Sequence, residues 1–77
     1  MKNLYFKIPF CSRARIERII INHLKCPCYK VVGRDKFFSN DEGLLIRTNG
    51  KLVFVSFLSE NPKLVEKVKR AFYTFYR

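Results

Sequence analysis

Apolar and polar positions alternate along the first segment of the chain, between residues 3 and 8. This period of two predicts a half-buried β-strand, which Pro9 ends. After Ser12, a favourable N-cap, apolar residues recur at helical spacing until Pro27, which predicts a helix over residues 12–25. The apolar face of that helix holds Ile16, Ile19, Ile20, His23 and Leu24.

The middle of the chain predicts a further strand, a loop and a hairpin. Cys28 to Gly33 has strand character, and the polar stretch from Arg34 to Glu42, which Phe37 and Phe38 interrupt, predicts a loop. Asn49 and Gly50 separate two apolar runs and predict a type I′ hairpin turn, which would place Thr48 opposite Lys51. One hairpin face would carry Leu44, Ile46, Val53, Val55 and Phe57, and the other Leu45, Arg47, Leu52, Phe54 and Ser56.

The last segment predicts a second amphipathic helix, with Asn61 as its N-cap and Pro62 at its first position. The expected order is therefore β-α-β-β-β-α in a single small basic domain over residues 1–77. This order predicts an α+β fold with a mainly antiparallel sheet of three to four strands. Two helices would cover one face of that sheet and leave the other face open.

The net charge of the chain indicates a function as well as a fold. Its formal net charge is +10, yet 48% of its residues are hydrophobic, too many for a disordered basic tail. Such an excess indicates an anionic partner, and we expect a non-enzymatic protein that binds nucleic acid, DNA or RNA. Phosphate contacts would come from basic stripes on the two helices: Arg13, Arg15, Arg18, Lys25, Lys63, Lys67 and Arg70.

A second candidate surface is the open sheet face, where Tyr5, Arg47 and Phe54 would mix aromatic rings with a cation. The segments 4–7 and 54–57 resemble the first-strand and central-strand motifs of RNA recognition motifs. That resemblance implies base stacking on Tyr5 and Phe54. The chain departs from the family at Ile8, Lys51 and Leu52, and it ends without a closing strand.

The alternative function is a small protein-interaction or inhibitor module. Its open apolar sheet face would form a homodimer or bind an acidic protein partner. A small nuclease that uses His23 is a third alternative, although no carboxylate pair is spaced for acid–base chemistry, so we expect no enzyme.

The three cysteines, Cys11, Cys26 and Cys28, are an odd number and form no recognisable disulfide framework. With His23 they have metal-ligand chemistry, but the predicted helix would hold Cys11 about 20 Å from Cys26. We therefore expect no metal and no cofactor. No apolar run approaches the roughly 18 residues that span a bilayer, so we expect a cytoplasmic protein that does not contact membranes.

Overall fold

The computed structural model describes the backbone of every residue except 1, 10 and 77. It describes the side chains of residues 3–9 and 11–72. An antiparallel sheet of five strands has the order β1-β5-β4-β3-β2. Its elements in chain order are β1 (Lys2–Lys7), α1 (Arg13–Arg18), the π-helical turn η1 (Ile19–His23), β2 (Cys28–Val32), β3 (Asp35–Ser39), β4 (Leu44–Asn49), β5 (Leu52–Phe57) and α2 (Pro62–Tyr76).

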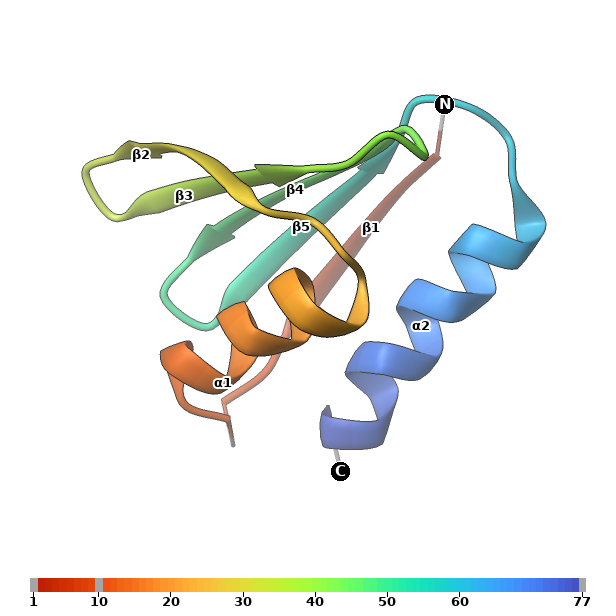
Figure 1. Cartoon of the computed structure of the whole chain (residues 1–77). Helices are drawn as coiled ribbons and strands as arrows, with labels where there is room; N and C mark the ends of the chain where they lie inside the picture. Colours follow the sequence, from red (N-terminus) through yellow and green to blue (C-terminus); the bar gives the residue numbers. More distant parts are fainter. Residues whose placement is uncertain (1, 10, 77) are drawn as a thin grey trace.

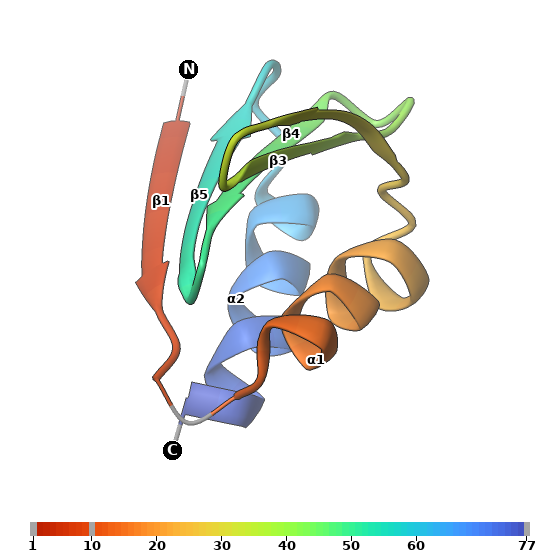
Figure 2. The same ribbon diagram turned by 90° about the vertical axis from the view of Figure 1, so that its left-hand side faces the viewer.

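Both helices pack on the same face of the sheet (Figures 1 and 2). The core between the two layers includes Ile46, Val53 and Val55 from the sheet, with Ile16 from α1 and Phe72 from α2. No helix of the described residues covers the opposite sheet face. The predicted α+β class, with a mainly antiparallel sheet and two helices on one face, is confirmed.

The sheet has one strand more than the sequence predicts. The expected loop from Arg34 to Glu42 contains β3, in which Phe38 points into the core and is fully buried. Its polar residues find partners: Lys36 forms an ion pair with Glu17 of α1, and the Asn49 amide donates a hydrogen bond to Asp35 at 2.7 Å. These tertiary partners stabilise a strand whose local sequence is typical of a loop.

The β4–β5 hairpin has the predicted faces, but its register differs by two residues. Asn49 pairs with Leu52 and Thr48 with Val53, so the two-residue loop is Gly50 and Lys51. Gly50 has φ +61°, and a glycine at the first loop position is what a type II′ turn uses. Because side chains on a strand repeat every two residues, a shift of two leaves each residue on its predicted face.

The first helix begins as predicted and ends differently. The Arg15 amide donates to the Ser12 side chain at 3.2 Å, which confirms the N-cap. The helix then widens: the Leu24 amide donates to the Ile19 carbonyl and the Cys26 amide to the Ile20 carbonyl, each at 3.0 Å. This wider turn changes the direction in which the last side chains point. It ends at His23, and Lys25, two residues further on, has a left-handed φ of +57°.

The second helix confirms its predicted start. The Asn61 side-chain oxygen accepts from the Leu64 amide at 3.3 Å, and its carbonyl accepts from the Val65 amide at 3.0 Å. Leu64, Val68 and Phe72 are buried against the sheet. Among the described residues, no helix has the length and apolar character needed to cross a bilayer.

The left-handed conformation of Lys25 gives a stability prediction. Lys25→Gly should raise the free energy of unfolding by about 0.5–1 kcal/mol, because glycine has no Cβ to clash at positive φ. Urea unfolding followed by circular dichroism measures the change. Lys25→Ala removes the same charge and keeps the Cβ, so it should not stabilise; an equal gain from alanine would contradict the backbone explanation.

Candidate nucleic-acid interface

The structure brings most residues of the two predicted basic stripes to one place between the helices. Arg15, Arg18 and His23 from α1 and η1 line a cavity of about 630 Å³ together with Arg70 from α2. A neighbouring cavity of about 340 Å³ shares His23 and Arg70, and its wall includes Lys63 and Lys67. We call this surface the interhelical groove and define it by its charged and titratable residues: Arg15, Arg18, His23, Lys63, Glu66, Lys67 and Arg70.

The interhelical groove is strongly cationic. Five lysine and arginine side chains line it, and Glu66 is the acid that accompanies them. The Glu66 carboxylate lies 3.8 Å from Arg70 Nε, but both side chains are mostly exposed, so this pair contributes little to stability. The excess of fixed positive charge in a concave surface favours an anion with several charges.

His23 lies in the interhelical groove, which corrects its prediction as a core residue. The side chain is exposed and lines both cavities. The reason is the π-helical turn, because regular α-helical spacing from Ile16 and Ile20 would have placed His23 on the apolar face. Sequence periodicity gave no signal of the wider turn.

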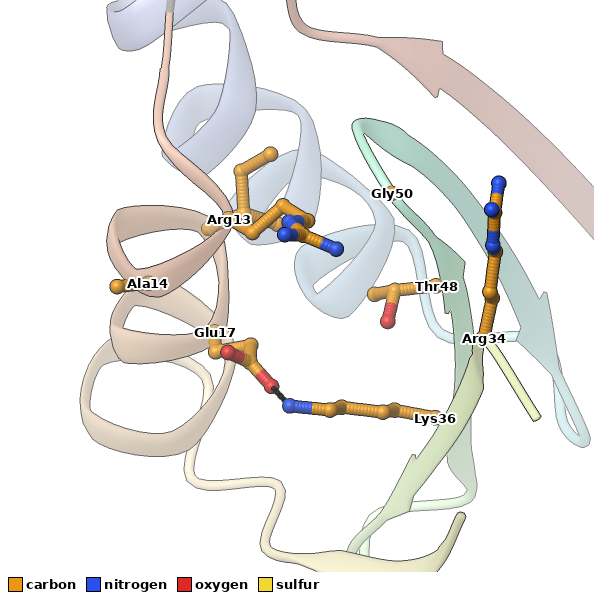
Figure 3. Close-up of a pocket in the computed structure, with 8 residues that line it drawn as sticks. Arg13, Ala14, Glu17, Arg34, Lys36, Thr48 and Gly50 are labelled. Atoms are coloured by element: carbon orange, nitrogen blue, oxygen red, sulfur yellow. Dashed lines mark hydrogen bonds and ion pairs between the residues drawn. The ribbon is translucent and has the colours of Figure 1, made fainter. Parts of the chain in front are cut away.

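Arg13 is separated from the other predicted phosphate contacts. It lines a different cavity of about 470 Å³ between α1 and the sheet, with Arg34 and Lys36 from the region of β3 (Figure 3). Glu17 points across this cavity to Lys36 and neutralises the charge of that lysine. Lys25 is exposed at the end of the first helix and lines none of these cavities.

The other predicted set, Tyr5, Arg47 and Phe54, lies together on the open sheet face. Tyr5 pairs with Phe54, and Phe54 pairs with Arg47, on three adjacent strands. The Tyr5 and Phe54 ring centres are 5.0 Å apart, and the Arg47 guanidinium carbon lies 4.4 Å from the Phe54 ring centre. The sheet therefore separates these residues from the interhelical groove.

The register extends this row to β3, which the sequence predicts as a loop, and to β2 beyond it. Arg47 pairs with Phe37 of β3, and Phe37 pairs with Lys30 of β2. Lys30 Nζ lies 5.9 Å from the Phe37 ring centre. We call Tyr5, Phe54, Arg47, Phe37 and Lys30 the sheet-face row. Sequence reasoning missed Phe37 because it placed this residue in a loop. It missed Lys30 because, without β3, nothing linked the predicted strand at Cys28 to Gly33 to the hairpin.

The cysteines do not form a site with the other ligand-type residues. Cys11 and Cys26 are buried and Cys28 is exposed, and all three are free thiols. The described part of the chain holds no cluster of three or more histidine, cysteine or acidic residues that could bind a metal. Burial raises the pKa of the Cys26 thiol from 9.0 to about 11, with a smaller contribution from Glu42.

The raised pKa of Cys26 predicts a loss of stability in alkaline solution. The unfolded thiol ionises above pH 9 while the folded thiol keeps its proton up to about pH 11, so stability falls between these values. Urea unfolding at a series of pH values should show a shallower decline for Cys26→Ala than for the wild type. Parallel curves would contradict the burial of this thiol.

Comparison with known proteins adds no relatives: the chain matches no family model, no curated protein and no solved structure. The resemblance to RNA recognition motifs is limited to the sequence motifs of residues 4–7 and 54–57. Those domains have a four-stranded sheet, whereas this sheet has five strands with β1 at its edge. The surfaces of the molecule are therefore the guide to its function.

Proposed function

We propose that this chain is a non-enzymatic nucleic-acid-binding protein whose interhelical groove holds a sugar-phosphate backbone. The observation that carries the proposal is the convergence of five cationic side chains, from helices far apart in the sequence, on one groove whose described residues include one carboxylate, Glu66. A solvated helix face spreads its charges away from one another. Here the charges of two helices meet at a concave surface.

The chemistry of the groove fits a chain of phosphates. Arginine donates paired hydrogen bonds to phosphate oxygens, and lysine contributes a compact charge. The two cavities share His23 and Arg70, so the cationic surface is elongated rather than a pocket for one small anion. Release of counterions from the nucleic acid would supply most of the binding free energy.

A steep salt dependence follows from this proposal. Five phosphate contacts give a slope of about −4.5 in log K against log salt for duplex DNA, or about a 500-fold loss from about 50 to about 200 mM. The combined variant Arg18→Gln, Lys63→Gln and Lys67→Gln should reduce that loss to about tenfold. Fluorescence anisotropy with a labelled mixed-sequence duplex measures both values.

The matched control removes three cations that line neither the groove nor the sheet-face row. Arg34→Gln, Lys51→Gln and Lys69→Gln together lower the net charge equally and should keep most of the slope. Equal loss in both triple variants would mean that net charge alone drives binding. Equally tight binding of polyglutamate would instead support the alternative, an acidic protein partner.

A further inference from the structure

An aromatic and cationic row crosses all five strands of the open sheet face, and the groove proposal does not use it. Its order from β1 to β2 is Tyr5, Phe54, Arg47, Phe37 and Lys30. Tyr29, the additional residue of a bulge in β2, also faces Phe37, with ring centres 6.3 Å apart. Two clusters of aromatic rings therefore lie on either side of Arg47.

We propose that the sheet-face row binds unpaired bases of single-stranded nucleic acid. One base would stack against Tyr5 and Phe54 and another against Phe37 and Tyr29, while Arg47 and Lys30 contact the phosphates. This inference rests on the proposed function, and it adds a ligand class, a single strand, and a second surface opposite the groove.

The exposure of the rings supports this assignment. Tyr5 and Tyr29 are each 56% exposed, and Phe37 and Phe54 are half-buried. Strands in a sheet lie about 4.8 Å apart, so Phe37 is about 10 Å from Phe54 across Arg47. That separation suits two bases of one extended strand, and stacking on an aromatic ring tolerates any base.

Polar side chains next to the row can contact the edges of bases. Ser39, Ser56 and Asn3 lie on the same face, two positions along their strands from Phe37, Phe54 and Tyr5. Their hydroxyl and amide groups both donate and accept hydrogen bonds. A base stacked on either ring cluster would thus meet polar groups at its rim.

The charge of this face argues against a second copy of the chain as its occupant. Arg47, Lys7 and Lys30 are exposed there, and Asp35 is the acid on its described residues, already bonded to Asn49. Two copies placed face to face would bring these cations together, and like charges in an interface are strongly unfavourable. A single strand instead supplies both planar rings and negative charge.

The test compares single-stranded and duplex probes. Phe54→Leu and Phe37→Leu keep apolar bulk but remove the flat ring, and each should weaken binding of an oligo(dT) of about 12 nucleotides by roughly 5- to 150-fold. Affinity for the mixed-sequence duplex should not change. Leu58→Ala, an exposed apolar residue outside the row, is the control and should have no effect.

If Phe54→Leu does not fold, Tyr5→Leu tests the same ring cluster. Tyr5 is exposed on the edge strand, so its replacement should leave the fold intact. Unchanged oligo(dT) affinity in folded Phe37→Leu and Tyr5→Leu would overturn this inference, while the salt dependence of duplex binding would still support the groove. Equal losses of affinity for the oligo(dT) and the duplex would also overturn it.

Light scattering tests the alternative occupant, a second copy of the chain. If the protein is a dimer that Phe54→Asp dissociates, and the oligo(dT) affinity stays intact, the face belongs to a second copy instead.

Discussion

Burial of a single face of the sheet against both helices is the constraint on which the rest of the structure depends. Val53 and Val55 of β5 point into the core, so Phe54 between them must point the other way. The same holds for Arg47 between Ile46 and Thr48 on β4. Because side chains alternate along a strand, the packing that forms the core also determines which residues the open face presents.

The two faces of the protein therefore offer a ligand different kinds of interaction. On the helix side, charges from α1 and α2 meet at the interhelical groove, where a nucleic acid bound as proposed would be held mainly by long-range attraction that salt screens. On the sheet side, the sheet-face row combines three aromatic rings with two cations, and a base bound as proposed would be held mainly by direct stacking contact. A sheet between these surfaces prevents one short ligand from reaching both.

Much of this arrangement is predictable from sequence, and the failures have physical causes. The turn signal at Asn49 and Gly50, with the side-chain period of two along each strand, predicted both hairpin faces. Ser12 and Asn61 predicted where each helix begins. The strand around Phe37 and Phe38 was missed because Glu17 and Asn49, distant in sequence, stabilise its polar residues. His23 was misplaced because a π-helical turn has no period that a sequence pattern reveals.

The contact between Arg47 and Phe54 also lowers the conformational entropy of the Arg47 side chain in the folded protein. A free arginine side chain has about 2 kcal/mol of rotamer entropy. The guanidinium carbon of Arg47 already lies 4.4 Å from the Phe54 ring centre, so part of that entropy is lost when the protein folds and not when a ligand arrives. The central cation of the row is thus positioned in advance, so a single strand that binds as proposed would lose little further entropy by ordering it.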